Sequence, residues 1–145
     1  MYFVDRNKIG LQLHYLQTNV ELLEKQSTWE TLIEKAALER ITHRILELIL
    51  DIGNGMIDGF IMRDPGSYED IIDILTDEKV YADNIGHDLK TLLLFRKKLV
   101  HDYTHIEHVE LYRAFFEKIS SLREFKTAIE NYLIHELGPV TAFKN

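Results

Sequence analysis

The sequence predicts an all-α protein, an up-down bundle of four to five helices without a sheet. Apolar residues recur at intervals of three and four positions over long stretches, which is the spacing of one face of an α-helix. The chain has only two prolines, and no stretch gives a convincing strand pattern. Apolar stripes kept over such lengths are typical of antiparallel helices packed in a bundle.

The longest apolar stripes predict the first two helices, one from Asp5 to about Gln26 and one from about Ser27 to Ile61. The first stripe consists of Ile9, Leu13, Leu16, Val20 and Leu23. The second consists of Ile41, Ile45, Leu48, Ile52 and Met56. The glycines of "GNGMIDG", residues 53–59, follow no strand, so we expect close helix approach or a bend there rather than a phosphate-binding loop.

The middle of the chain carries turn and cap signals. "RDPGS" at residues 63–67 predicts a turn. Ser67 and Asp70 have the spacing of a capping box, which predicts that a short helix begins here. A further helix is predicted from about Thr76 into the basic segment near residue 100.

The last predicted helix follows a break. Thr104 and Glu107 again have capping-box spacing, which predicts a break and a new helix start just after Tyr103. The apolar stripe of this helix consists of Val109, Tyr112, Phe116, Ile119 and Leu122. The helix is predicted to run to about Leu137, where Gly138-Pro139 is a strong stop signal.

Size and composition favour one folded domain over residues 1–145. Apolar residues make up 46% and charged residues 28% of the chain, as in an ordinary globular protein. The absence of cysteine excludes disulfides, thiolate zinc sites and a cysteine nucleophile. The first ten residues lack a basic region followed by an apolar core, and the most apolar run is interrupted by Glu47, Asp51 and Asn54. We therefore expect no signal peptide, no membrane span and a cytoplasmic location.

The charge balance limits contacts with nucleic acid. With 17 basic and 24 acidic residues, the formal net charge is −7. Proteins that coat nucleic acid through a broad basic surface usually look different. The densest positive cluster is Arg96-Lys97-Lys98, so any such contact is expected to be local. A solvated helix face is the alternative interpretation of this cluster.

The segment "FRKKLVHDYTH", residues 95–105, holds the residue types that RNA cleavage without a metal needs. Histidine can move protons near neutral pH, and a guanidinium can bind the phosphoryl oxygens as they gain charge. Arg96 and His101 are the candidates. Residues five apart on an ideal helix are rotated by about 140°. The two side chains can therefore act on one atom only if the helix ends near His101, the arginine reaches around, or a second chain contributes.

The form Arg-x4-His-x-Tyr in "RKKLVHDY" resembles the signature of HepT-like toxins, minimal members of the HEPN superfamily. The resemblance extends from about Asp5 to Leu137. It includes the long helix pair, "SYEDIIDIL" with an intervening helix, and the closing segment "LYRAFFEKISSLREFKTAIENYL". It implies a HEPN-like helical homodimer in which paired motifs line a cleft and cleave RNA, with no metal and no other cofactor.

The resemblance also implies a role for each residue of the motif. Arg96 and His101 match the catalytic arginine and histidine. Tyr103 matches the tyrosine that a nucleotidyltransferase antitoxin modifies with AMP, which blocks the nuclease. Lys97 stands where the superfamily commonly has a small polar residue, and we expect Lys97 and Lys98 to contact RNA. A catalytically weak or inactive helical dimer, acting as a binding or regulatory module, is the alternative to which Lys97 points.

A metal site is the sharpest rival interpretation. His101, His105 and His108 would share one face of a continuous helix and could then bind a divalent metal. The break predicted at Thr104 argues against that continuity. The other histidines are interpreted as surface or satisfied core residues.

The carboxylates of the second helix allow another interpretation. Glu39, Glu47 and Asp51 could serve acid–base chemistry, but a polar helix face paired with Arg40 and Arg44 is the preferred explanation. Three tyrosines are interpreted as packing residues: Tyr68, Tyr81 and Tyr112.

Overall fold

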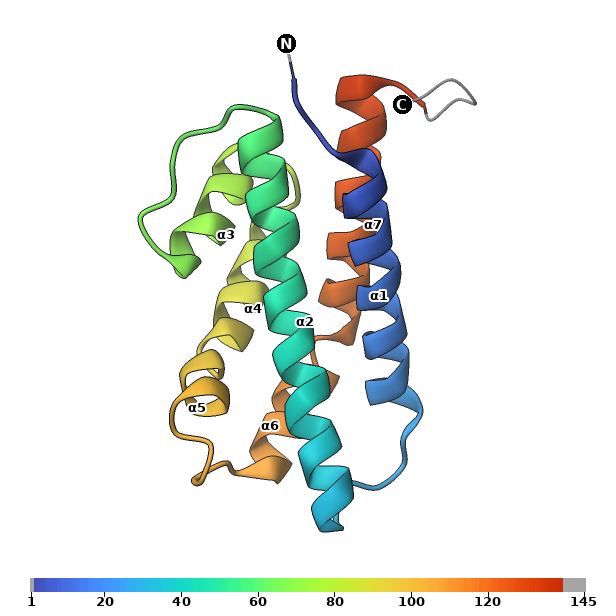
Figure 1. Cartoon of the computed structure of the whole chain (residues 1–145), viewed down its shortest axis with the longest axis vertical. Helices are drawn as coiled ribbons and strands as arrows, with labels where there is room; N and C mark the ends of the chain where they lie inside the picture. Colours follow the sequence, from blue (N-terminus) through green and yellow to red (C-terminus); the bar gives the residue numbers. More distant parts are fainter. Residues whose placement is uncertain (1, 140–145) are drawn as a thin grey trace.

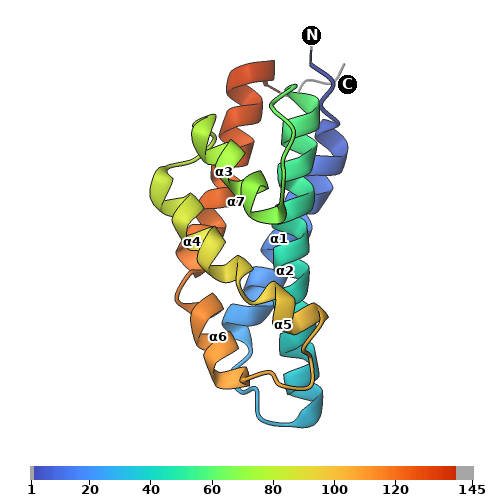
Figure 2. The ribbon, with the colours of Figure 1, turned by 90° about the vertical axis from the view of Figure 1, so that its left-hand side faces the viewer.

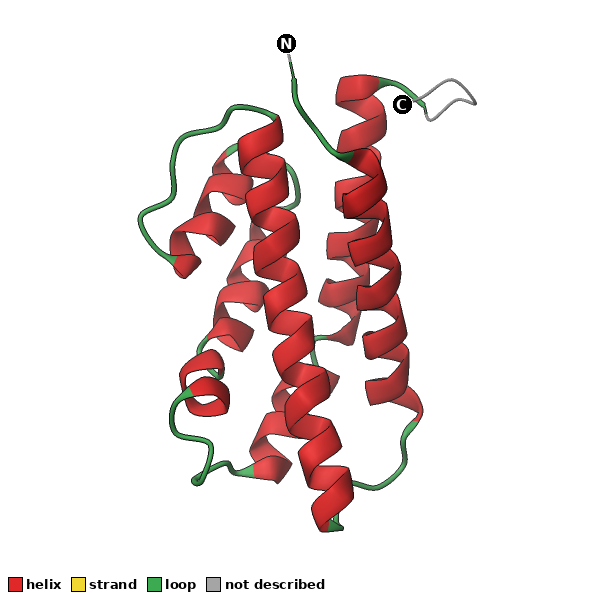
Figure 3. Cartoon of the chain, viewed as in Figure 1, coloured by secondary structure: helices red, strands yellow, loops and turns green. Residues whose placement is uncertain are grey.

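The computed structural model describes residues 2–139, which form seven helices and no strand (Figures 1 and 3). The helices are α1 (Arg6–Lys25), α2 (Leu32–Gly59), α3 (Tyr68–Asp77), α4 (Asp83–Leu93), α5 (Arg96–Val100), α6 (His108–Phe116) and α7 (Ile119–Leu137). The all-helical prediction is confirmed. The helices outnumber the four to five predicted elements because the last two predicted elements are broken.

The long helices begin and end at side-chain and backbone caps. Asp5 accepts a hydrogen bond from the backbone amide of Lys8 at 3.0 Å, so α1 begins where the sequence predicted. Helix α2 begins later than the predicted Ser27, because Thr31 and Glu34 form a capping box. The Glu34 amide donates to the Thr31 hydroxyl at 3.1 Å, and the Thr31 amide donates to the Glu34 carboxylate at 3.0 Å.

The helix predicted from Thr76 into the basic segment is divided into parts of α3, α4 and α5. Helix α3 ends at Asp77, and Lys79 adopts a left-handed φ of 60°. Val80 and Tyr81 then turn into the core, where the Tyr81 hydroxyl donates to the Ile72 carbonyl at 2.7 Å. A residue in the left-handed region cannot continue a helix. The turn therefore separates α3 from α4.

The last predicted helix is also broken, at Glu117 and Lys118 between α6 and α7. The predicted apolar stripe continues across both helices and is wrong in its first half. Val109 is 72% exposed and Phe116 is 44% exposed. The buried residues of the two helices are Leu111, Phe115, Ile119, Ser121, Leu122, Phe125, Ile129 and Leu133. The break shifts the register of the apolar face between the two halves.

Helix α2 runs the length of the molecule between two groups of helices (Figures 1 and 2). Helices α1 and α7 lie on one side of it in Figure 1, and α3, α4 and α5 lie on the other. Helix α2 contacts α1, α3, α5 and α6, and its buried residues include Ile45, Ile49 and Ile52. Thus α2 is the element against which the basic segment is positioned.

The end of α7 returns to the start of α1. Gly138, with φ 83°, donates its amide to the Ile134 carbonyl at 2.8 Å and ends α7 as predicted. Arg6 on α1 donates to the Gly138 carbonyl at 2.9 Å. Across residues 2–139, none of the helices combines the length and the apolar character needed to span a membrane.

Candidate active site

The basic segment folds into a short helix that stops at the candidate histidine. Helix α5 has five residues, begins at Arg96 and ends at Val100, with His101 as its C-cap. The predicted break is confirmed, but its predicted cause is wrong. The Thr104 hydroxyl bonds to His105 Nδ1 at 2.9 Å, and Glu107, the N-cap of α6, has no side-chain cap bond. His101 still lies in the helical region and donates its amide to the Lys97 carbonyl at 2.8 Å, so its side chain keeps the helical offset of about 140° from Arg96.

Arg96 is held by side chains from two other helices. Its Nε donates to Oε2 of Glu47 on α2 at 2.8 Å, and its guanidinium carbon lies 4.3 Å from the ring centre of Tyr68 on α3. The Arg96 side chain is 19% exposed. The hydrogen bond to Glu47 raises the pKa of Arg96, so its positive charge is fixed. The arginine is therefore oriented before any substrate arrives.

Glu47 belongs to a polar row on the face of α2 that α5 and α6 cover. His43 Nε2 lies 3.9 Å from the same Glu47 oxygen, and Glu39 Oε2 lies 2.7 Å from His108 Nε2. Glu39, His43 and Glu47 are spaced four residues apart along α2. The preferred interpretation, a polar face paired with neighbouring arginines, is wrong for Glu47, because its partner is Arg96.

The remaining motif side chains face solvent. Lys97, Lys98, His101 and Tyr103 are exposed, and Tyr103 is 62% exposed. Within the described part of the chain, no hydrogen bond or ion pair joins Arg96 to His101. A single chain thus presents an oriented Arg96 and a solvent-exposed His101 that do not contact each other.

The three histidines considered for metal binding do not share one helix. His101 caps α5, His105 lies in the loop and His108 begins α6. Among residues 2–139, no group of three His, Cys, Asp or Glu side chains is arranged to hold a metal ion. The continuous helix that this interpretation required is absent.

Three side chains at the site were missed from the sequence as partners of the motif: Tyr68, Glu47 and His43. Glu47 precedes Arg96 by 49 positions, and no periodic pattern links residues so far apart. The only local signals were the i, i+4 spacing of His43 and Glu47 and the position of Tyr68 directly after the helix cap Ser67.

The sequence matches one protein family and is half identical to a protein of Bacillus subtilis. Residues 13–129 match the family model described as ribonuclease HepT-like. The chain is 50% identical over 144 residues to "Putative RNase YutE" of Bacillus subtilis (strain 168), with 99% of this chain and 100% of the relative covered. A solved structure of YutE from Bacillus subtilis, described as a cytosolic protein of unknown function, has a TM-score of 0.94 and covers the same shares of both chains.

More distant structures share the fold. A tri-AMPylated HEPN toxin of Shewanella oneidensis in complex with its MNT antitoxin has a TM-score of 0.72 at 16% identity, over 86% of this chain and 95% of the toxin. A toxin–antitoxin structure with AMP-PNP has a TM-score of 0.74 at 14% identity, over 83% and 96% of the two chains. The family match covers more than half of the sequence, and the chain belongs to the ribonuclease HepT-like family.

Proposed function

We propose that this protein is a metal-independent RNA endonuclease of toxin type in which Arg96 and His101 carry out the chemistry. The observation that carries the proposal is Arg96, oriented by Glu47 and Tyr68, on the same short helix whose C-cap is the exposed His101. Membership of the ribonuclease HepT-like family supports the same chemistry.

In the proposed reaction the 2′-hydroxyl of a ribose attacks the adjacent phosphorus. The bond from phosphorus to the 5′ oxygen breaks, leaving a 2′,3′-cyclic phosphate and a 5′-hydroxyl. His101 moves a proton, either from the attacking hydroxyl or to the leaving oxygen. Arg96 binds the non-bridging oxygens as their negative charge grows. Lys97 and Lys98 hold neighbouring phosphates.

A homodimer would complete the site. In a single chain Arg96 and His101 make no direct contact, and a second copy would bring a second pair of motifs into the same cleft. Light scattering of the purified protein checks this part of the proposal. A mass of twice the chain is expected, and a strict monomer that still cleaves RNA would rule it out.

The proposed partner is a nucleotidyltransferase-type antitoxin that attaches AMP to Tyr103. The exposed Tyr103 hydroxyl is open to modification, and the Shewanella oneidensis relative of the same fold is AMPylated in its complex with an MNT antitoxin. An added AMP carries a negative charge next to the phosphate-binding residues, where it would repel RNA.

Cleavage of single-stranded RNA by the pure protein in EDTA tests the proposed chemistry. We expect products that end in 2′,3′-cyclic phosphate and 5′-hydroxyl, because the attack is intramolecular. A requirement for a divalent metal, or products with 3′-hydroxyl ends, would contradict the mechanism. A dimer that binds RNA without cleaving it would instead be the binding module considered above.

Mass spectrometry of the protein made with and without a nucleotidyltransferase encoded beside it tests the partner. An AMP adduct on the peptide that contains Tyr103 is expected, and Tyr103→Phe should abolish it. Tyr15→Phe, an exposed tyrosine on α1, serves as the control. An adduct elsewhere on the chain would refute the assignment of Tyr103.

A further inference from the structure

A neutral hollow lies beside the arginine of the proposed active site. It has a volume of about 410 Å³ and is open to solvent. Its lining consists of Asn54, Pro65, Gly66, Ser67, Tyr68 and Ile71. None of these side chains is charged. A hollow of this composition suits an uncharged flat group with polar edges better than a phosphate, whereas the neighbouring Arg96 suits the phosphate.

Tyr68 is shared between the hollow and the active site. The Arg96 guanidinium lies over one face of the Tyr68 ring, and the same ring lines the hollow. The Tyr68 side chain is 53% exposed. Aromatic rings that remain half exposed next to a phosphate-binding arginine are the usual platforms on which unpaired RNA bases stack.

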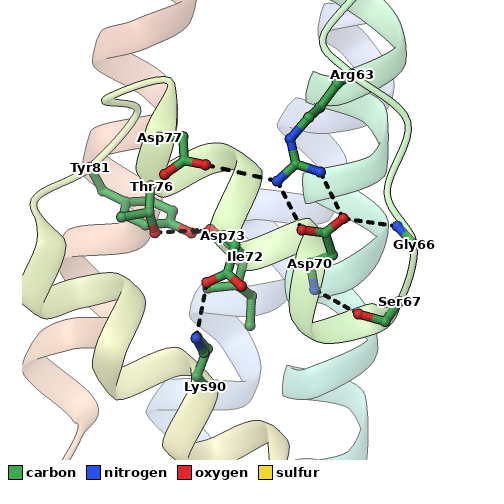
Figure 4. Close-up of polar contacts among 10 residues, drawn as sticks. All are labelled: Arg63, Gly66, Ser67, Asp70, Ile72, Asp73, Thr76, Asp77, Tyr81 and Lys90. Carbon is green, nitrogen blue, oxygen red and sulfur yellow. Dashed lines mark hydrogen bonds and ion pairs between the residues drawn. The ribbon is translucent and has the colours of Figure 1, made fainter.

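Hydrogen bonds and an ion pair connect Gly66 and Ser67, two lining residues of the hollow, to Asp70 and Arg63 (Figure 4). Arg63 binds both carboxylate oxygens of Asp70, at 2.8 and 2.9 Å, and the Gly66 amide donates to Asp70 at 2.9 Å. The Ser67 hydroxyl accepts the Asp70 amide at 3.0 Å and caps α3. Hydrogen bonds from Arg63 and Gly66 lower the pKa of Asp70 to about 2, so the Asp70 carboxylate keeps its negative charge at any ordinary pH. A preformed wall lowers the entropic cost of ordering a base against it.

Polar groups at the rim could contact the edge of a base. Asn54 on α2 is exposed and carries both a donor and an acceptor. The Ser67 hydroxyl keeps its own proton free to donate, because it accepts in the cap bond. Ile71, which is almost fully buried, adds only a small apolar area to the lining.

We propose that this hollow is the subsite for one unpaired base of the RNA, stacked on Tyr68 and adjacent to the phosphate held by Arg96. The proposal rests on the proposed function, because it names how the same site recognises its substrate. It predicts that the protein acts on single-stranded rather than base-paired RNA, since a base in a helix is not available for stacking on protein.

Binding of an RNA that cannot be cleaved tests the subsite apart from the chemistry. The probe is a short single-stranded RNA, fully 2′-O-methylated, with 2-aminopurine at one position at a time. We expect fluorescence quenching at the position that occupies the hollow. Tyr68→Leu should remove the quenching and weaken binding about tenfold, the usual effect of losing one stacked base. Tyr68→Phe, which keeps the ring, should bind as the wild type does.

Two controls separate stacking from a displaced arginine. Tyr15 on α1 forms a second tyrosine–arginine pair, with Arg44 on α2 at 5.5 Å, and Tyr15→Leu should have no effect. An abasic nucleotide at the quenched position should weaken binding to the wild type but not further weaken binding to Tyr68→Leu.

The outcomes distinguish the two proposals. The wild type could quench 2-aminopurine and Tyr68→Leu could lose that quenching, while the protein never cleaves unmodified RNA. This result would support the subsite and contradict the proposed nuclease. The protein could instead cleave RNA while the wild type and Tyr68→Leu bind the intact RNA equally well and the abasic RNA no more weakly. This result would overturn the subsite alone. Tighter binding of free AMP than of the RNA would also overturn it, because the hollow would then hold a mononucleotide.

Discussion

Arg96 is positioned by two residues that lie far from it in the sequence. Glu47 fixes its Nε, and Tyr68 covers one face of its guanidinium. Such a pair orients the arginine, but the carboxylate also competes with the phosphate that we propose as its ligand. Glu47 is 37% exposed and close to solvent, so the interaction is worth only about 1 kcal/mol. A substrate phosphate can therefore displace or share it.

Replacing Glu47 by Gln should tighten RNA binding. Gln can still accept a hydrogen bond from Arg96 but no longer repels a phosphate. We expect the KM for RNA to fall severalfold, while Glu47→Ala should lower kcat because Arg96 loses its orientation. Steady-state cleavage kinetics measure both.

The matched control for this prediction is the glutamate–arginine pair on the α1–α7 side of the bundle. Glu24 binds Arg123 through two hydrogen bonds, the longer at 3.1 Å. Glu24→Gln should leave both constants unchanged. A rise in KM for Glu47→Gln, or identical behaviour of the two variants, would contradict the assigned role of Glu47.

At the scale of single elements, helix ends and close approaches decide where the site residues lie. The capping box of Thr31 and Glu34 determines where α2 begins, and α2 carries Glu47. Gly53 lets α3 approach α2, because a Cβ at this position would lie 2.6 Å from Ile71 Cγ2. The position of Tyr68 over Arg96 depends on this approach.

The cap of α2 predicts a pH dependence of stability. Hydrogen bonds from the amides of Thr31 and Glu30 and from the Thr28 hydroxyl lower the pKa of Glu34 from 4.5 to about 2. Since the folded-state pKa is depressed, the carboxylate stabilises the fold above about pH 4.5, and this contribution is lost as the pH falls towards 2. Glu34→Gln should therefore be less stable than the wild type near neutral pH and equally stable at the acid end.

Urea denaturation followed by circular dichroism at several pH values measures this difference. Glu124→Gln on α7 is the control, because Glu124 is exposed and makes no side-chain hydrogen bond among the described residues. A stability gap between wild type and Glu34→Gln that persists unchanged to the acid end would refute the explanation.

A single methyl group at Gly53 should destabilise the packing of α2 on α3. Ile71 Cγ2 must shift to accept it, and Leu75 Cδ1 lies 3.4 Å from the same point. We expect Gly53→Ala to lower the unfolding free energy by about 1–3 kcal/mol. Gly10→Ala, where nothing lies within 4 Å of the new Cβ, should raise it by about 0.5–1 kcal/mol. Thermal unfolding measures both variants. Melting temperatures that shift in the same direction for both would contradict this explanation.

At the scale of the whole molecule, an acidic protein is proposed to bind a polyanion. The formal net charge is −7, so attraction must come from the local cluster formed by Arg96, Lys97 and Lys98. Because few phosphates are contacted, the RNA affinity should depend less on salt concentration than it does for proteins with a broad basic surface.

The salt dependence of RNA binding measures the size of this cluster. Three contacts per chain predict a slope of about −2 for log K against log salt, at roughly 0.7 per phosphate on a single strand. Lys98→Gln should reduce the slope by about 0.7, and Lys25→Gln at the end of α1 should not change it. A steep salt slope that Lys98→Gln does not change would show that the RNA binds to another surface of the protein.

The sequence predicts local features better than partnerships between elements. The start of α1, the cap at Ser67 and the stop at Gly138 follow from short patterns and are confirmed. The break was predicted just after Tyr103 and for the wrong reason, since α5 already ends at Val100, Thr104 does not cap α6, and α6 begins only at His108.

Contacts across the bundle could not be predicted in the same way. The pairing of Arg96 with Glu47 and Tyr68 depends on how α5, α2 and α3 pack, and packing of separate helices leaves no periodic signal in the chain. The misjudged stripe of α6 has a related cause. Periodicity alone did not reveal the break at Lys118.

The central claim is that Arg96 and His101 cleave RNA without a metal, and a single cleavage assay tests it most directly. Wild type, Arg96→Ala and His101→Ala are incubated with single-stranded RNA in EDTA, with His105→Ala and Arg123→Ala as controls of the same residue types. We predict cleavage by the wild type and both controls, and a loss of at least about a hundredfold for Arg96→Ala and His101→Ala. Cleavage that survives both substitutions, or that appears only with a divalent metal, would contradict the account.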